Sequence, residues 1–265
     1  MKILLDNLNK KDEDFAKELI RKIEYIAYHN YVDFRKLYNK EDIKEQQSYL
    51  KYFYAQPKEN YFKARWEWLV NEYCIKKDMS RFGFKIDEWD IIDCWAYIGD
   101  SSIAFSNYFP KAKIYALEPN KKNFNELQNV IKIHKKDDRI QALNVGAWEK
   151  DSEAFLSDEG IWSKIWTTGE KVTIKSIDSL VEEYKMIPRL IKRDIEWFEY
   201  FSMLWTIETL KKHRPILFIS VYHCGKDLFE IKKLIQELGL NYNFTFTRWD
   251  AMTPFSDTLL VCYPN

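Results

Sequence analysis

Glycine is scarce in this sequence, with seven residues in 265, where average usage near 7% gives about 19. A chain so poor in glycine has few positions at which the backbone can take a positive φ or approach a ligand closely. Aromatic residues, by contrast, are abundant, at 17% of the chain, and ten of them are tryptophans. Some turns favour glycine. A tryptophan at such a position therefore bears on whether a ligand can bind there.

An excess of charge, clustered cysteines and long apolar runs are missing as well. The 41 basic and 41 acidic side chains cancel, which argues against nucleic acid or an anionic membrane surface as the main partner. The four cysteines lack CxxC spacing, so neither a zinc site nor a disulfide framework is indicated. No apolar run approaches the roughly 18 residues of a membrane span, and the first residues lack a signal-peptide core. We therefore expect a cytoplasmic protein without a membrane partner.

Residues 1–85 are predicted to form a helical N-terminal lobe. In the first stretch, apolar residues recur at steps of three and four, which places them on one helix face: Phe15, Leu19, Ile23, Ile26 and Ala27. A second amphipathic stretch follows Pro57. The aromatic residues of this lobe are interpreted as its core.

From residue 89 onward, strand and helix patterns alternate, which predicts an α/β domain over 86–265 with a mostly parallel sheet. Strands are expected at 89–97, 113–117, 139–145, 190–195, 216–222, 242–247 and 258–262, with shorter β segments between 148 and 175. Helices are expected at 101–108, 120–134, 177–183, 198–212 and 228–238, with Asn120 as a cap. The last two strands lie close together in the sequence and predict an antiparallel hairpin.

In such a sheet, ligands bind outside the carboxyl ends of the strands. Glu118 follows the second strand, about twenty residues after the first loop, and a carboxylate there is suited to accept hydrogen bonds from ribose hydroxyls. Asp194 and Glu196 end the fourth strand, where they could act as base and orienter, or could equally cap the next helix. Hard cations usually recruit more than two oxygen ligands, so no metal site is predicted.

These segments resemble the FkbM-type S-adenosylmethionine-dependent methyltransferases. The resemblance covers residues 89–263 and rests on six motifs in order: DCWAYIGDSS, IYALEPNKKNFNELQNV, LNVGAW, IKSIDSLVEE, IKRDIEWFE and RPILFISVYH. It implies a Rossmann-like sheet of seven strands with helices on both faces and the last strand antiparallel. It also implies S-adenosylmethionine as cofactor and methyl transfer to a hydroxyl, often of a sugar in a glycan or metabolite.

The resemblance also implies roles for single residues. Around the methionine part of the cofactor it places Asp93, Trp95, Gly99, Asp100 and Ser101. It assigns the ribose to Glu118 and the adenine to Asn144 and Val145. Toward the acceptor it places Asp194, Glu196 and His223, with Asp194 or His223 removing the hydroxyl proton, although His223 could equally cap the end of the fifth strand.

This sequence departs from the family pattern at two glycine positions, which here hold Trp95 and Trp197. Trp205 also replaces a usual glycine, and Trp162 and Trp166 stand in a loop that is usually polar. If position 95 needs a positive φ, a tryptophan there is a conformational outlier. An indole buries roughly 150 to 250 Å² where it packs, so Trp95 and Trp197 are predicted to fill the cleft.

Three hypotheses follow. The first is an active methyltransferase whose tryptophans turn away from the pocket or stack on the cofactor. The second is a catalytically impaired, natural or engineered, relative in which Trp95 and Trp197 occupy the pocket. The third is a nicotinamide-dependent oxidoreductase that uses Glu118 for the ribose, and it is the weakest because the first loop lacks two glycines of GxGxxG.

Overall fold

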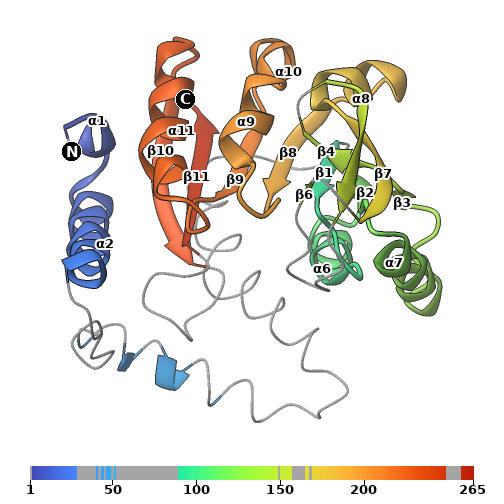
Figure 1. Ribbon diagram of the computed structural model, residues 1–265, viewed down its shortest axis with the longest axis horizontal. Helices are drawn as coiled ribbons and strands as arrows, with labels where there is room; N and C mark the ends of the chain where they lie inside the picture. Colours follow the sequence, from blue (N-terminus) through green and yellow to red (C-terminus); the bar gives the residue numbers. More distant parts are fainter. Residues whose placement is uncertain are drawn as a thin grey trace.

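A computed structural model describes residues 2–28, 40, 43–44, 46–48, 51, 89–148, 150–156, 165–166, 169–248 and 258–265 (Figure 1). The second predicted helical stretch after Pro57 lies outside these residues, as do the aromatic side chains that were interpreted as the core of the lobe. The division into residues 1–85 and 86–265 therefore stays a prediction.

The centre of the described structure is a seven-stranded sheet in the order β10-β11-β9-β8-β1-β2-β3. Five strands run parallel: β1 (Asp90–Cys94), β2 (Lys113–Leu117), β3 (Ile140–Leu143), β8 (Pro188–Arg193) and β9 (Ile216–Ser220). β11 (Thr258–Pro264) is antiparallel to both of its neighbours, β9 and β10 (Tyr242–Arg248). This confirms the predicted seven-stranded, mostly parallel sheet with a terminal antiparallel hairpin.

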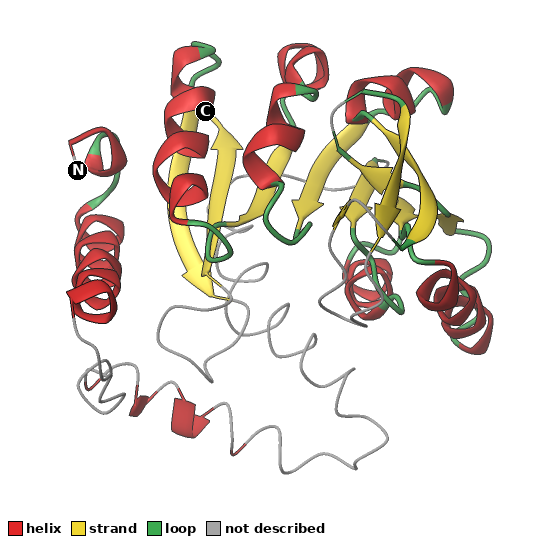
Figure 2. Ribbon diagram, in the orientation of Figure 1, coloured by secondary structure: helices red, strands yellow, loops and turns green. Residues whose placement is uncertain are grey.

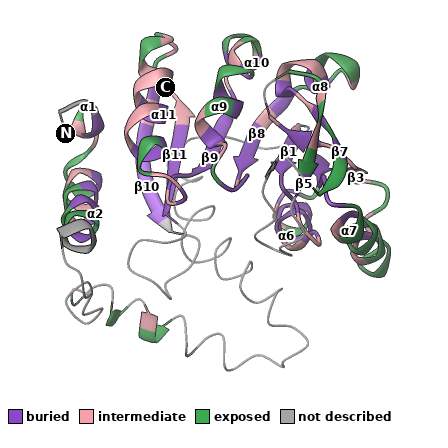
Figure 3. Ribbon diagram, in the orientation of Figure 1, coloured by how far each residue is buried: buried purple, intermediate pink, exposed green. Residues whose placement is uncertain are grey.

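Helices cover both faces of the sheet (Figure 2). α6 (Asp100–Tyr108) and α7 (Lys121–Ile133) share one buried cluster with the sheet, and α8 (Ile177–Glu183), α9 (Glu199–Leu204), α10 (Ile207–His213) and α11 (Gly225–Glu237) share another. β9 is buried along its whole length, as expected of a parallel strand covered on both sides (Figure 3). The Asn120 side chain caps α7 by accepting a hydrogen bond from the Asn123 backbone N–H, as predicted.

The helix predicted at 198–212 is two helices, α9 and α10. The buried Arg193 guanidinium donates to the side chains of Ser202 and Thr206 at the break. Asp178 on α8 accepts the backbone N–H groups of Glu208 at 3.2 Å and Thr209 at 2.8 Å, so α10 has its own N-terminal cap. Because that cap comes from a residue 30 positions away, the local pattern could not reveal the break.

A second, smaller sheet occupies the region of short β signals. Its order is β4 (Gly146–Ala147), β7 (Glu170–Lys175), β5 (Ser152–Leu156) and β6 (Ile165–Trp166). Leu156, Val172 and Ile174 extend from it into the buried cluster that also holds α8 and α11.

Of the two described N-terminal helices, the second packs on the large sheet and the first packs on a helix that covers it. α1 (Lys2–Leu5) contacts α11, and α2 (Lys10–Tyr28) contacts β10. Asp12 Oδ1 accepts the Thr245 hydroxyl at 2.7 Å and the Phe246 backbone N–H at 3.2 Å. The Phe15 ring stacks on Phe246 with centroids 6.0 Å apart. Helix α2 therefore covers the edge strand of the sheet.

The buried side of α2 differs slightly from the predicted one. Leu19 is buried as expected, together with Ala16 and Ile20, but Ile23 is 37% exposed. Ile23 therefore does not belong to the buried side of α2. The side chains of Ile26 and Ala27 lie outside the described residues.

Candidate active site

The carboxyl ends of β1, β2, β8 and β9 meet at one edge of the sheet. Asp93 belongs to the end of β1, Glu118 follows β2, Asp194 follows β8 and His223 lies just beyond β9. Because these strands are parallel neighbours or near neighbours, the residues predicted from separate motifs come to the same edge.

The loop after β1 contains the glycine that its geometry requires. Gly99 has φ 94° and begins α6, and a Cβ there would lie 2.6 Å from Leu127 Cδ1. Trp95 and Tyr97 also have positive φ, 66° and 51°, although neither is a glycine. The sequence-based expectation that position 95 is a conformational outlier is therefore confirmed.

The Asp93 carboxylate is occupied by protein groups. Its Oδ2 accepts the hydroxyls of Ser101 at 2.5 Å and Ser102 at 2.6 Å, and its Oδ1 lies 3.2 Å from Lys192 Nζ. Lys192 also donates to the Trp95 carbonyl at 3.1 Å. Since Asp93 is fully buried, its contacts fix the first loop, and Ser101 takes part in the same network. Asp100 is half-buried in the first turn of α6, and its Oδ1 accepts the Ser101 N–H at 2.9 Å.

Glu118 joins the first two loops. Its Oε2 accepts the Tyr97 N–H and its Oε1 the Asn120 N–H, both at 2.9 Å. Burial raises the pKa of the Glu118 carboxyl to about 8. The Asn144 side chain donates to the carbonyls of Glu118 and Pro119, each at 2.9 Å, so it ties the loop after β3 to the loop after β2.

Val145 beside it is half-buried and packs on the core. The structure thus brings Glu118, Asn144 and Val145 to one corner of the edge.

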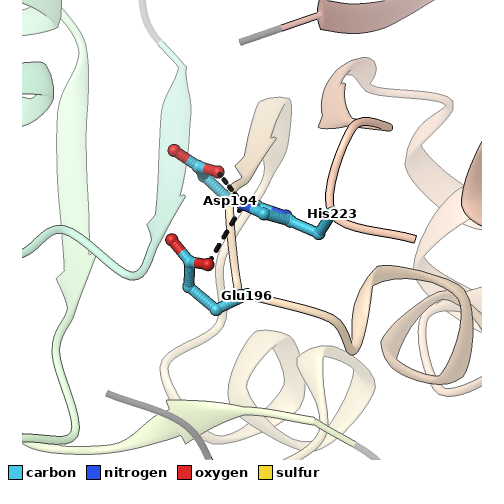
Figure 4. A group of neighbouring side chains, drawn as sticks. All are labelled: Asp194, Glu196 and His223. Atoms are coloured by element: carbon cyan, nitrogen blue, oxygen red, sulfur yellow. Dashed lines mark ion pairs between the residues drawn. The ribbon is translucent and has the colours of Figure 1, made fainter. Parts of the chain in front are cut away.

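His223 lies among three carboxylates. Its Nδ1 is 2.7 Å from Glu199 Oε1, and its Nε2 is 3.2 Å from Glu196 Oε2 and 3.7 Å from Asp194 Oδ1 (Figure 4). The His223 and Glu199 side chains are buried, whereas that of Asp194 is 23% exposed. Asp194 also accepts the Tyr222 hydroxyl at 3.2 Å. The three predicted acceptor-side residues therefore do lie together.

The charges of this cluster shift its protonation. Burial alone lowers the pKa of His223, but the close carboxylates of Glu196, Glu199 and Asp194 raise it to about 11. Burial raises the pKa of the Glu196 carboxyl. For Asp194, burial is outweighed by the charges of Lys192 and His223, which lower its pKa. A protonated imidazole has no lone pair, so Asp194 is the better candidate base in this arrangement.

Sequence reasoning missed three buried charged residues: Lys192, Glu199 and Asp227. Asp227 on α11 accepts the Tyr200 N–H at 3.3 Å, and burial together with the charge of Glu199 raises its pKa to about 7. A lysine directly after the apolar pair Leu190 and Ile191 in strand β8 was a signal for the first. Glu199 and Asp227 looked like ordinary first-turn acids, which favour a helix N-terminus.

The tryptophans behave differently from one another. Trp95 is 9% exposed and belongs to the buried cluster, whereas Trp197 is 47% exposed despite its φ of 80°. Trp205 is 42% exposed. Trp197 thus does not fill an enclosed pocket, while the indole of Trp95 is packed inside the protein. The side chains of Trp162 and Trp166 lie outside the described residues.

Comparison with known proteins places the fold. No protein-family model and no curated relative matches the sequence. The methyltransferase FkbM from Methylobacillus flagellatus KT matches with a TM-score of 0.58 and 20% identity over 97% of this chain. The match covers 63% of that chain, so the present chain spans somewhat less than two thirds of its length. The present chain has the Rossmann-like fold of that methyltransferase.

Two further solved structures match with lower TM-scores. A putative caffeoyl-CoA O-methyltransferase from Staphylococcus aureus has a TM-score of 0.47 and 12% identity, covering 84% of this chain and 100% of its own. Fibrillarin from Aeropyrum pernix, in complex with natively bound S-adenosyl-L-methionine, has a TM-score of 0.43 and 12% identity over 69% of each chain. Among the helices of the described residues, none is long and apolar enough to cross a membrane.

Proposed function

We propose that this chain is an S-adenosylmethionine-dependent O-methyltransferase of the FkbM type, acting in the cytoplasm on a sugar hydroxyl of a glycan or metabolite. The observation that carries the proposal is that Glu118 and the group of Asp194, Glu196 and His223 lie at the same carboxyl edge of the sheet. In folds of this class the cofactor and its reaction partner bind at that edge. Zero net charge supports a small-molecule or glycan acceptor over nucleic acid.

The residues at the edge suit the cofactor. Glu118 keeps acceptor capacity beyond the two backbone N–H groups that it binds, because a carboxylate has about four lone-pair sites. Ribose hydroxyls would add donors to this buried carboxylate, and Asn144 with Val145 would border the adenine. When bound, S-adenosylmethionine supplies a methyl group that is already activated by the sulfonium.

The residues of the chain then have two tasks, which are to orient the acceptor hydroxyl and to remove its proton. Asp194 Oδ1 is held by the Tyr222 hydroxyl and faces His223, and its side chain is partly exposed, so an acceptor hydroxyl can reach it. We assign Asp194 as the group that accepts the hydroxyl proton. The exposed rings of Trp197 and Phe201, close in sequence to Glu196, offer apolar surface against which a sugar can pack. Holding the oxygen in place would supply most of the rate enhancement.

The second candidate is a non-catalytic relative that binds no cofactor. Trp95 supports it, because a buried indole with a φ of 66° stands in the loop that should approach the cofactor. The exposed Trp197 does not contribute to such a block.

Isothermal titration with S-adenosylmethionine and S-adenosylhomocysteine tests both candidates. The methyltransferase proposal expects micromolar binding, weakened at least tenfold, about 1.4 kcal/mol, by Glu118→Ala and unchanged by the exposed control Glu208→Ala. Circular dichroism must show that each variant is folded.

Absence of binding to folded wild-type protein, with binding gained in Trp95→Gly, would favour the non-catalytic relative. Equal affinity of the wild type and Glu118→Ala would remove Glu118 from the site.

A further inference from the structure

The group around His223 holds more negative charge than it balances. Three carboxylates lie close to one imidazole, those of Asp194, Glu196 and Glu199, and the carboxyl of Asp227 is near enough to Glu199 and His223 to feel their charges. Glu196, Glu199 and Asp227 are at least nine-tenths buried. Buried charges are stable only when they are paired, hydrogen-bonded or bound to a cation. One imidazolium leaves several carboxylate charges over.

Glu199 fixes the direction of the imidazole. Its Oε1 lies 2.7 Å from His223 Nδ1 and also accepts the Ile195 backbone N–H at 3.0 Å. Glu199 is fully buried, so it has no freedom to swing away. A metal-binding histidine usually has a carboxylate hydrogen-bonded to the ring nitrogen that does not bind the metal. This carboxylate orients the ring so that the other nitrogen faces the metal.

The other ring nitrogen faces two carboxylates without a hydrogen bond. Among the described residues, His223 Nε2 and Glu196 Oε2 have no hydrogen-bond partner, although they lie 3.2 Å apart and both residues are more than nine-tenths buried. The two atoms are close but are not aligned as donor and acceptor. Figure 4 shows that Asp194 and Glu196 approach the same edge of the ring.

The spacing of these three atoms is that of a ligand set. One ligand atom from each of Asp194, Glu196 and His223 lies within 4.8 Å of the others. Nitrogen and oxygen ligands lie about 2.0 to 2.2 Å from a bound transition metal, which puts neighbouring ligands roughly 3 to 4 Å apart. The distances from His223 Nε2, 3.2 Å to Glu196 and 3.7 Å to Asp194, fall in this range.

We propose that Asp194, Glu196 and His223 bind one divalent transition-metal ion, with Glu199 as a positioning residue behind the imidazole. The metal takes the place of the proton on His223 Nε2, which is released to solvent when the ion binds. One imidazole nitrogen with two carboxylates suits manganese, iron, cobalt or zinc better than calcium, which takes oxygen ligands alone. Three protein ligands leave coordination positions open. If the proposed methyl transfer also holds, on which this last point rests, the open position faces the acceptor hydroxyl.

The test uses the full chain, freed of metal with EDTA and titrated with Mn²⁺. Loss of the free Mn²⁺ paramagnetic resonance signal should report one saturable site per chain. Pulsed resonance on the wild type should show nitrogen-14 coupling from a directly bound imidazole, and this reading needs no variant. Absence of saturable binding, or binding without nitrogen coupling, would overturn the proposal.

Variants then assign the ligands. His223→Gln and Glu196→Gln should each weaken Mn²⁺ binding at least tenfold, and Glu199→Gln should weaken it about 10- to 100-fold and alter the nitrogen coupling. His213→Gln is the matched control, because His213 lies before β9 and His223 beyond its other end. Unchanged affinity in a folded His223→Gln protein would contradict the assignment.

Titration of the same samples with S-adenosylmethionine separates the two proposals. Metal binding without cofactor binding removes the methyltransferase proposal alone, and the reverse result removes the metal site alone.

Discussion

The loops after β1 and β8 leave neighbouring strands of the sheet and treat buried charge in opposite ways. In the first, the carboxylate of Asp93 faces the ammonium of Lys192 and two serine hydroxyls. In the second, Glu196, Glu199 and Asp194 share one histidine. Each loop also holds a tryptophan at positive φ, buried in the first and exposed in the second. The contacts of the first loop are all within the protein, whereas the second loop carries the residues of the cation site that we propose.

The largest effect is expected in the loop after β1, where the charges of Asp93 and Lys192 are paired. Lys192→Met removes the positive charge and leaves Asp93 buried without a counter-charge, which should lower the free energy of unfolding by about 3 to 5 kcal/mol. Urea denaturation measures this. The control is Lys211→Met, whose exposed ion pair with Glu208 should be worth less than about 1 kcal/mol. Similar losses in both variants would mean that the buried pair contributes no more than a surface pair.

Trp95→Gly should also destabilise, by about 2 kcal/mol. Removal of a buried indole costs about 3 to 5 kcal/mol, and relief of the left-handed backbone returns about 1 to 2 kcal/mol. Urea denaturation of the single variant decides the sign. An increase in stability would show that the Trp95 indole contributes little packing.

The group of acids around His223 should stabilise the fold more when Asp227, on α11, is neutralised. The pKa of Asp227 is raised to about 7, so the folded protein holds a proton that the unfolded chain releases. This contribution is complete below about pH 3.8 and is lost as the pH rises to about 7. Asp227→Asn keeps an oxygen for the Tyr200 N–H and should raise the free energy of unfolding at pH 8 by about 1 kcal/mol.

No gain is expected for Asp227→Asn near pH 4. Thermal unfolding in EDTA at both pH values measures the difference, with the exposed Glu208→Gln as control. A gain of the same size at both pH values would have a cause other than the charge.

The smallest effect belongs to Trp197→Gly, which should stabilise by about 0.5 to 1 kcal/mol. A glycine takes the φ of 80° without strain, and the exposed indole loses little packing. Trp205→Gly is the matched control, because Trp205 is similarly exposed but has a negative φ of −107° and should gain nothing. A shift of the melting temperature upward in the first variant and not in the second would sharpen the comparison of the two loops.

The sheet was predictable because its strands are buried on both sides and read as apolar runs. Residues 113–117 and 177–183 were predicted with the bounds that β2 and α8 have. β8 was placed two residues late at both ends, because its first residues, Pro188 and Arg189, do not continue the apolar run. Lys192 and Arg193 lie inside the strand and both are buried. Their burial depends on Asp93, Ser202 and Thr206, which lie elsewhere in the chain.

The sequence predicted where the candidate site lies in the fold, but it did not predict the contacts among its side chains. Asp194, Glu196 and His223 follow strands whose ends meet, so their proximity follows from the fold. That Glu199 turns the imidazole, and that Lys192 occupies Asp93, depends on side-chain geometry across strands and helices. No local pattern in the sequence carries that information.

The contact of α2 with β10 joins two segments that the ribosome synthesises at very different times. Asp12 and its partner Thr245 are 233 residues apart in sequence. At about 5 to 20 residues per second, a ribosome makes the second roughly 10 to 50 seconds after the first. Helix α2 therefore emerges long before the strand on which it packs, and its apolar stripe waits exposed until the C-terminal hairpin is complete.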